Sequence, residues 1–259
     1  MALCYRGLMS VWALSDPHLS FGVPDKNMGT FGPEWAGYAE KMAANWKKNI
    51  SQEDLVLIPG DISWAMNIEE ALIDLNWIDA LPGTKVIIKG NHDYWWSSAG
   101  KLSKVMPPSI RFIQNNAFNW NDITIGGARL WDSPEYSFEK LIDFRENPKA
   151  KPKVPKDLEK EKKDSEKVFV RELERLKSSL DQLNPKARLR IALTHYPPIG
   201  ADLKPSRASE ILESYRINIC IFGHLHSLKK GISPFGEARG VRYLLTSCDY
   251  LNFMPLKIL

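Results

Sequence analysis

The sequence predicts an α/β fold in which helices cover a partly parallel β-sheet. Short apolar runs of strand length recur along the 259 residues, and each is followed by a polar loop. Segments with apolar residues at helical spacing alternate with these runs, which is the order typical of an α/β core. The chain is long enough to bury a large core, and it shows neither repeats nor a linker. We therefore expect one domain over residues 1–259.

The first half of the chain is predicted to form three strands, each followed by a loop and a helix. The apolar runs at 9–15, 54–58 and 85–89 have the length of buried strands, and a loop rich in Gly and Pro follows the first. Apolar residues at helical spacing predict a helix over 34–49. Asn67 and Glu70 resemble a capping box, which predicts a helix from Asn67 to about Asp79. A third helix is predicted over 97–105.

The second half is predicted to contain five more strands and two helices. The strands are expected at 110–114, 123–130, 187–194, 217–222 and 241–246, and the helices at 156–183 and 206–215. Gly126-Gly127 predicts a bulge or kink in its strand. A proline-rich, irregular stretch precedes the long helix, whose charged residues flank a single apolar stripe. We therefore expect a charged helical insertion at about 135–183.

Positive charge is concentrated in one segment. The net charge is +4, and residues 149–167 contain eight lysines against five acidic residues. This segment is either a solvated helix face or a mobile cap over an active site. Charge confined to one segment does not make the basic face of a nucleic-acid-binding protein, so we expect no nucleic-acid partner.

The cysteines and the apolar runs bear on the compartment. Cys4, Cys220 and Cys248 are far apart and lack Cys-x-x-Cys spacing, which favours a reducing environment over a disulfide framework. No apolar run has the length of a transmembrane segment. The apolar start of the chain leads straight into Asp16-Pro17-His18, so we interpret it as a strand and not a signal peptide. We expect a cytoplasmic protein; the sequence does not indicate its oligomeric state.

Every histidine of the chain follows a predicted buried strand within a few residues. The five are His18, His92, His195, His224 and His226. A single histidine is more often structural than catalytic, but five at the same kind of position indicate a shared site. Open α/β sheets bind ligands beyond the carboxyl ends of their strands.

Three carboxylates, Asp16, Asp61 and Asp93, also lie at predicted strand ends. Residues i and i+2 of an extended chain point to the same side, so Asp16 and His18 can reach one ion together. Asp, Asn and His ligands without thiolates suit Mn, Fe, Zn, Ni or Co. The sequence therefore predicts a transition-metal site.

Five short blocks occur in a fixed order. They are Asp16-x-His18, Gly60-Asp61, Gly90-Asn91-His92-Asp93, His195 and Gly223-His224-x-His226. The ordered set resembles the calcineurin-like metallophosphoesterase superfamily. This resemblance implies a four-layer sandwich in which two mixed β-sheets pack together and helices flank them. It also implies a two-metal-dependent phosphoester hydrolase acting on a small phosphoester.

The resemblance further implies a role for each residue of the blocks. One metal would be bound by Asp16, His18, Asp61 and His226. Asp61 would bridge to the second metal, which Asn91, His195 and His224 would complete. His92 would be catalytic, contacting the phosphate and the leaving group, and Asp93 would orient it. Two divalent metal ions are expected, with Mn the first choice in vitro.

The same resemblance implies a mechanism. A hydroxide bridging the metals would attack phosphorus in line, while His92 assists the leaving group as general acid. Two divalent ions, two aspartates and one hydroxide leave a site charge of about +1, which suits an anionic phosphoester.

Departures from the family pattern limit the substrate. Trp64 stands where many relatives carry a second Asp after Gly60-Asp61, which weakens a cyclic-nucleotide phosphodiesterase assignment. The Arg-Gly pair of the protein phosphatases is missing, which argues against a protein Ser/Thr phosphatase. A phosphodiesterase or a small-molecule phosphatase remains, with a nuclease acting on DNA or RNA, or a non-catalytic metal-binding scaffold, as alternatives.

Three tryptophans, Trp64, Trp95 and Trp96, follow predicted ligands closely. They could form an aromatic wall that stacks a flat leaving group, or pack around the loops. We favour packing and expect Trp95 and Trp96 to differ in role.

Overall fold

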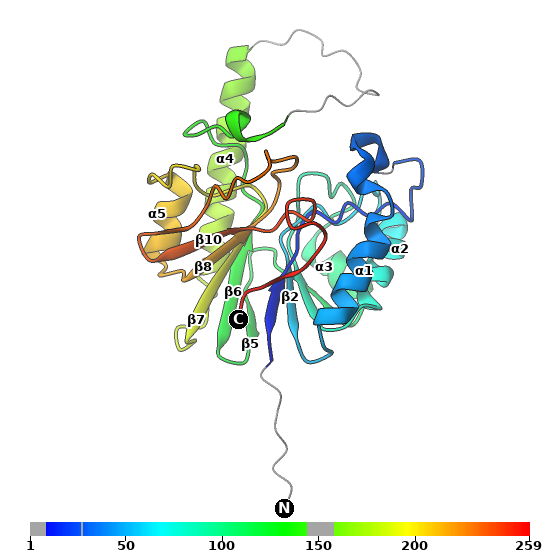
Figure 1. Cartoon of the computed structure of the whole chain (residues 1–259). Helices are drawn as coiled ribbons and strands as arrows, with labels where there is room; N and C mark the ends of the chain where they lie inside the picture. Colours follow the sequence, from blue (N-terminus) through cyan, green and yellow to red (C-terminus); the bar gives the residue numbers. More distant parts are fainter. Residues whose placement is uncertain (1–8, 27, 144–157) are drawn as a thin grey trace, which may run out of the picture.

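The structure is a computed structural model of the chain, and it describes residues 9–26, 28–143 and 158–259. Within these ranges two mixed β-sheets pack face to face, and helices cover both outer faces (Figure 1). The predicted α/β sandwich of four layers is confirmed.

The first sheet has five strands in the order β11-β1-β2-β3-β4. Its strands are β1 (Val11–Ala13), β2 (Leu55–Ile58), β3 (Thr84–Ile87), β4 (Ile110–Phe112) and β11 (Leu256–Lys257). The first four run parallel and β11 pairs antiparallel with β1. The carboxyl ends of four consecutive strands therefore meet at one edge of this sheet.

The second sheet has six strands in the order β5-β6-β7-β8-β10-β9. They are β5 (Phe118–Trp120), β6 (Ile123–Ala128), β7 (Leu189–Thr194), β8 (Ile219–Phe222), β9 (Glu237–Ala238) and β10 (Val241–Leu245). The central strands β6, β7, β8 and β10 run parallel, and the outer strands β5 and β9 are antiparallel to their neighbours.

The helices divide between the two outer faces. They are α1 (Tyr38–Asn49), α2 (Ile68–Asp79), α3 (Ala99–Val105), α4 (Leu158–Leu180) and α5 (Arg207–Ser214). Short 3-10 turns span Met28–Phe31, Pro33–Trp35 and Glu139–Leu141. The first three helices pack on the first sheet, and α4 and α5 pack on the second (Figure 1).

Alternation along the strands produces three apolar layers. In β2, Leu55 and Leu57 point into the layer between the sheets, whereas Val56 and Ile58 point toward the helices of the first sheet. Strands buried on both faces are continuous apolar runs, which is why these strands could be recognised in the sequence.

Two local predictions have different outcomes. The predicted helix start at Asn67 is confirmed, because its side chain accepts a hydrogen bond from the Glu70 N–H at 2.9 Å.

The bulge predicted at Gly126-Gly127 is wrong, because the pairing of β6 with β7 is continuous through both residues. A β-carbon at Gly127 would overlap the Leu193 carbonyl, and one at Gly126 would press on α4. Close packing explains these glycines.

The charged segment is described only in part. Of the predicted insertion at about 135–183, residues 144–157 lie outside the described residues. Helix α4 buries an apolar stripe, Phe169, Leu173, Leu176 and Leu180, against the second sheet. This segment's status as an insertion, and the use of its lysine-rich part as a cap, remain predictions.

We expect Asp54→Asn to lower the free energy of unfolding by about 1–3 kcal/mol at neutral pH. The Asp54 carboxylate accepts hydrogen bonds from the Ser10 and Ser51 N–H groups at 2.8 and 2.9 Å and from the Trp12 indole at 3.3 Å. Burial raises the pKa of this carboxyl, but these donors outweigh burial and lower the pKa below its usual value.

The sign of the pH dependence follows from that lowered pKa. The carboxylate stabilises the fold fully above the unfolded-state pKa of about 3.9, and the benefit is lost as pH falls through the lower folded-state pKa. Urea unfolding of the wild type and Asp54→Asn at pH 7 and near pH 3 should therefore show that the difference in their free energies of unfolding is smaller in acid. The neighbouring exposed residue provides a control, Glu53→Gln, which should change little. An equal difference in the free energy of unfolding at both pH values would contradict the stabilising role of the ionised Asp54 carboxylate.

Candidate metal centre

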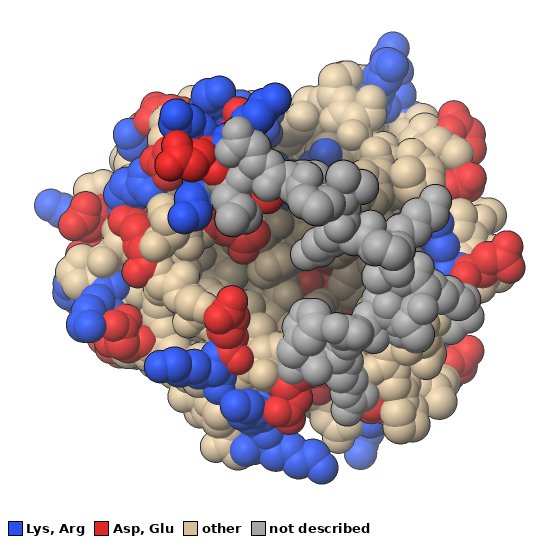
Figure 2. All heavy atoms as spheres, turned by 90° about the horizontal axis from the view of Figure 1, so that it is seen from above, with Lys and Arg blue, Asp and Glu red and all other residues tan. Residues whose placement is uncertain are grey.

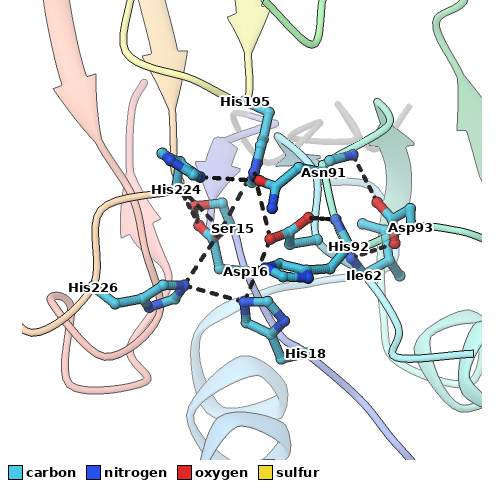
Figure 3. Close-up of polar contacts among 12 residues, drawn as sticks. Ser15, Asp16, His18, Ile62, Asn91, His92, Asp93, His195, His224 and His226 are labelled. Atoms are coloured by element: carbon cyan, nitrogen blue, oxygen red, sulfur yellow. Dashed lines mark hydrogen bonds and ion pairs between the residues drawn. The ribbon is translucent and has the colours of Figure 1, made fainter. Parts of the chain in front are cut away.

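The predicted site residues come together at the edge where the parallel strands end, the edge that faces upward in Figure 1. Asp16 and His18 follow β1, Asp61 follows β2, and Asn91 follows β3. His195 follows β7, and His224 and His226 follow β8. Figure 3 shows the histidine side chains and Asn91 pointing toward one another from these separate strand ends.

One group of possible metal ligands consists of Asp16, His18 and His226, whose ligand atoms lie within 4.8 Å of one another. The two imidazole Nε2 atoms of His18 and His226 are 3.1 Å apart. His226 Nε2 also lies 3.7 Å from Asp16 Oδ1. These atoms surround one small volume.

A second group contains Asn91, His195 and His224. The Asn91 side-chain oxygen lies 2.6 Å from His195 Nε2 and 3.0 Å from His224 Nδ1. Asp61 stands between the groups, because its Oδ2 is 3.4 Å from His195 Nε2 and 3.6 Å from His18 Nε2. Asp16, Asp61 and His195 also form a set of ligand atoms within 4.8 Å.

The donor atoms of this cluster fit divalent cations. His195 Nδ1 faces the Pro59 carbonyl at 3.0 Å, and His226 Nδ1 faces the Asp249 carboxylate at 2.8 Å. Both partners only accept hydrogen bonds, so in a neutral ring the proton resides on Nδ1 and Nε2 presents its lone pair to the centre. Lone pairs of nitrogen and oxygen that face one another at such distances call for a cation between them, and outer hydrogen bonds of this kind orient metal-binding histidines.

The protonation of the cluster points the same way. Burial lowers the pKa of His18 and of His224 well below the usual value. Burial also lowers the pKa of His195, but the charge and hydrogen bond of Asp61, the charge of Asp16 and the Pro59 carbonyl together outweigh burial and raise that pKa to about 9. Burial lowers the pKa of His226 too, but Asp249, through its charge and hydrogen bond, together with the charges of Asp16 and Asp61 raises that pKa to about 9. The carboxylates thus attract positive charge into the cluster, as a metal site requires.

Four of the predicted ligands have left-handed backbone conformations. The φ angles are 57° at Asp16, 43° at His18, 51° at Asp61 and 70° at His224. Such conformations cost non-glycine residues about 1–3 kcal/mol each and cluster at functional sites. The strand-to-loop turns are held in these conformations by packing, which aims the side chains at one point.

The glycines of the motifs provide space for the ligands. A β-carbon at Gly90 would overlap the Asp61 carboxylate and backbone N, and one at Gly223 would overlap the Asp16 carboxylate. A β-carbon at Gly60 would lie 2.7 Å from His195 Nδ1. Each glycine therefore makes room for a ligand that comes from another strand.

We expect Gly90→Ala to weaken metal binding by at least about tenfold, because Asp61 must move to admit the methyl group. The matched control is Gly100→Ala in α3, where the added β-carbon meets nothing within 4 Å. That change should instead raise the free energy of unfolding by about 0.5–1 kcal/mol. Metal titration and urea unfolding of both variants test this. Unchanged metal affinity in Gly90→Ala would contradict this prediction, because it would show that the loop admits the methyl group without displacing Asp61.

His92 lies at the rim of the cluster. Its backbone N–H donates to Asp61 Oδ1 at 2.8 Å, and its ring lies 4.5 Å from the Trp64 ring and 5.6 Å from the His18 ring, between centroids. Burial lowers the pKa of its imidazole. His92, His18 and Trp64 line a cavity of about 220 Å³ with Met28 and Trp35. A ligand in this cavity would contact His92 directly.

Asp93 contacts groups other than the His92 side chain. Its carboxylate accepts hydrogen bonds from the N–H groups of Gly90 at 2.7 Å and Ile62 at 2.8 Å, and from the Trp95 indole at 3.0 Å. It is fully buried, and burial raises its pKa to about 7. Among the described residues no hydrogen bond joins it to the His92 ring. Asp93 ties the loops after β2 and β3 together, so any effect on His92 passes through the backbone.

The three tryptophans have separate environments. Trp95 is buried and bonded to Asp93, and Trp64 stacks on His18 with centroids 5.0 Å apart. Trp96 donates to the Gln114 side chain at 3.0 Å and lines a different cavity. Packing accounts for the position of Trp95, whereas Trp64 and Trp96 each line a cavity.

Two neighbours of the ligands were missed from the sequence. Asp249 bonds His226 as described and also accepts from the Ser227 N–H at 2.8 Å. Ser15 donates its hydroxyl to Asp16 Oδ2 at 2.5 Å. Asp249 follows β10, so the same rule of polar residues at strand ends could have identified it.

Comparisons with known proteins agree with this arrangement. A family model described as calcineurin-like phosphoesterase matches residues 9–228. The Gene 66 protein of Mycobacterium phage D29 is 33% identical over 86 residues, which are 33% of this chain and 41% of that protein. The chain thus matches less than half the length of that relative.

Among the described residues, no helix is both long and apolar enough to cross a membrane.

Two solved structures are similar over most of the chain. One is a protein of unknown function from Aquifex aeolicus, with 16% identity, a TM-score of 0.48 and coverage of 96% of this chain and 95% of the other. The other is the phosphopantetheinyl hydrolase of Mycobacterium tuberculosis, with 14% identity, a TM-score of 0.49 and the same coverage.

Proposed function

The chain belongs to the calcineurin-like phosphoesterase family, and from this premise we propose that it is a metal-dependent phosphoester hydrolase that cleaves small phosphoesters with His92 assisting the leaving group. The observation that carries the proposal is the convergence of seven candidate ligands, with His92 at their rim beside a cavity. Both a phosphodiesterase and a small-molecule phosphatase are compatible with it.

We assign the ligands to two ions. Asp16, His18 and His226 would hold one ion, Asn91, His195 and His224 the other, and Asp61 would contact both because its Oδ2 lies between the groups. When bound, two such ions activate a water molecule and offset the charge that builds on the phosphorus oxygens. Mn, Fe, Zn, Ni and Co all suit this donor set, and Mn is our choice for assays.

The protein's own part is to position the substrate and to handle the leaving group. The hydrogen bond from the His92 N–H to Asp61 holds the His92 backbone beside the ligands. The His92 side chain lines a cavity together with His18 and His226, so a phosphoester in that cavity would contact the imidazole, which would stabilise or protonate the departing oxygen. The cavity beside His92 is lined mainly by aromatic and apolar side chains, which suits an uncharged leaving group.

Two alternatives, a nuclease and a non-catalytic scaffold, are less well supported. Seen from the site's edge, the molecule is hollowed at its centre, and basic and acidic side chains intermix around the hollow outside the grey atoms (Figure 2). A nuclease would be expected to present a continuous basic surface for the phosphate backbone. A scaffold needs no histidine at the rim of the metal cluster.

The test is turnover by the purified protein. With Mn²⁺ we expect hydrolysis of a chromogenic phosphoester, loss of activity with a chelator and recovery when Mn²⁺ is restored. Comparing a monoester with a diester, followed by nucleotides and sugar phosphates, would then define the substrate. Metal content without turnover on this panel would favour the scaffold.

A further inference from the structure

A second cavity, of about 500 Å³, lies beside the metal centre. Its walls come from the loops after β3 and β4, from the end of β6 and from α4. The side chains that matter here are Lys89, Trp96, Arg129, Arg171, Glu172 and Arg175. None of them belongs to the predicted metal ligands, and the volume is within the range of small-molecule sites.

The cavity has a large excess of positive charge. Four of its lining side chains are cationic, and Glu172 is the one acidic residue among the described lining residues. The Glu172 side chain is only 1% exposed, and its Oε1 is 2.6 Å from Arg175, 3.3 Å from Arg129 and 4.0 Å from Arg171. One buried carboxylate oxygen is therefore shared by three arginines, which leaves most of their charge uncompensated.

The arginines also keep unused hydrogen-bond donors. Arg129 Nε is buried and has no hydrogen-bond partner among the described residues. Each guanidinium carries five N–H donors and remains charged at neutral pH, so one shared oxygen cannot satisfy three of them. Ser98 lines the same cavity, and its side chain makes no capping bond to α3.

We propose that this cavity binds the anionic group of a small molecule, a phosphate or a group of similar shape and charge. Arginines recognise such groups through paired N–H donors, and Trp96 supplies a flat apolar wall for the rest of the ligand.

The cavity adjoins the metal centre through the backbone. Lys89 comes two residues before Asn91, and the Arg129 carbonyl accepts the N–H groups of His195 at 3.1 Å and Tyr196 at 2.9 Å. The anionic group can therefore belong to the far end of the substrate, a case that rests on the proposed function, or to a separate phosphorylated molecule.

Binding of inorganic sulfate to the metal-loaded protein tests the cavity without turnover. At fixed ionic strength, we expect calorimetry to give a Kd that rises roughly fivefold in Arg171→Gln and falls roughly fivefold in Glu172→Gln. The opposite signs follow from charge, whereas a purely structural role of the cluster would weaken binding in both. Lys177→Gln, on the same helix but outside the cavity, is the matched control and should leave the Kd unchanged.

Equal sulfate affinity in the wild type and all three variants would overturn the proposal. The test does not depend on the variant of the buried Glu172 alone. The Arg171 side chain is 57% exposed, so its replacement is compatible with folding. Thermal unfolding of each variant checks that the fold is retained.

Kinetics distinguish the two sources of the anion. If it belongs to the substrate, Arg171→Gln should raise KM roughly fivefold for a nucleoside bisphosphate and leave KM for a single-phosphate chromogenic ester unchanged. If it belongs to a separate molecule, sulfate should alter hydrolysis of the chromogenic ester in the wild type and not in Arg171→Gln. Lack of turnover on every ester would defeat the proposed function, while the sulfate measurement would still decide the cavity.

Discussion

Asp61→Asn should abolish the paired metal site and lower kcat/KM by about 10³-fold or more. The Asp61 Oδ2 atom lies between the two groups, 3.4 Å from His195 Nε2 and 3.6 Å from His18 Nε2. Removing its charge therefore weakens both sites at once. The ions are expected to supply several kcal/mol of transition-state stabilisation, and each 1.36 kcal/mol corresponds to about tenfold in rate.

The substitution is chosen to preserve shape. Asparagine can still accept the His92 N–H that Asp61 Oδ1 accepts at 2.8 Å, so the loop keeps that contact. Metal content by elemental analysis and kcat/KM on a chromogenic ester with added Mn²⁺ measure the effect. Asp54→Asn removes a buried carboxylate far from the cluster, and we expect it to reduce stability while the metal content stays at the wild-type level. Normal turnover by metal-free Asp61→Asn would falsify the proposed function.

His92→Ala should keep the metals and lower kcat by about 10²–10⁴-fold. The bond from residue 92 to Asp61 uses the backbone N–H, so it survives removal of the imidazole. The ring itself faces the cavity shared with His18 and Trp64. Loss of the ring thus removes a group that would act on the substrate and leaves the ligand geometry in place.

The dependence on the leaving group separates a general acid from a packing residue. Nitrophenolate departs without a proton, whereas an alkoxide requires one, so the loss in His92→Ala should be larger for an alkyl phosphoester than for a nitrophenyl phosphoester. Tyr94→Phe is the matched control, because the exposed Tyr94 ring lies 6.2 Å from the His92 ring between centroids and contributes no predicted ligand. Loss of both metals in His92→Ala, or equal losses on the two esters, would show that the division between ligands and acid is wrong.

The long strands and helices could be predicted because their signals are local. Strands buried on both faces, such as β2 and β8, are continuous apolar runs that are followed by polar residues. The strands β5, β9 and β11 were missed; they have two or three residues each and hold the edges of the sheets. A run that short contains no periodicity to detect, so its pairing depends on the strand beside it.

The sequence by itself determined the fold class, the family and the residues that could bind metal, because strand ends and the spacing of Asp, Asn and His are properties of short segments. The resemblance to the family also implied how these residues group, but local sequence alone does not, and only the tertiary structure supplies the distances between them. His18 and His226 are 208 positions apart and yet have ring nitrogens 3.1 Å from each other. Asp249 supports His226 from a third segment of the chain.

The tertiary structure also decided what several residues are for. Gly90 is part of an ordinary turn in the sequence, but in the folded chain it provides the space that Asp61 occupies. Asp93 follows His92 in the chain and yet bonds the loop after β2. Arg171 and Arg175 flank Glu172 on the same helix, and only the packing of α4 against the second sheet brings Arg129, which follows β6, to that carboxylate. Contacts between distant segments have no counterpart in local sequence, since they depend on how the two sheets bring their edges together.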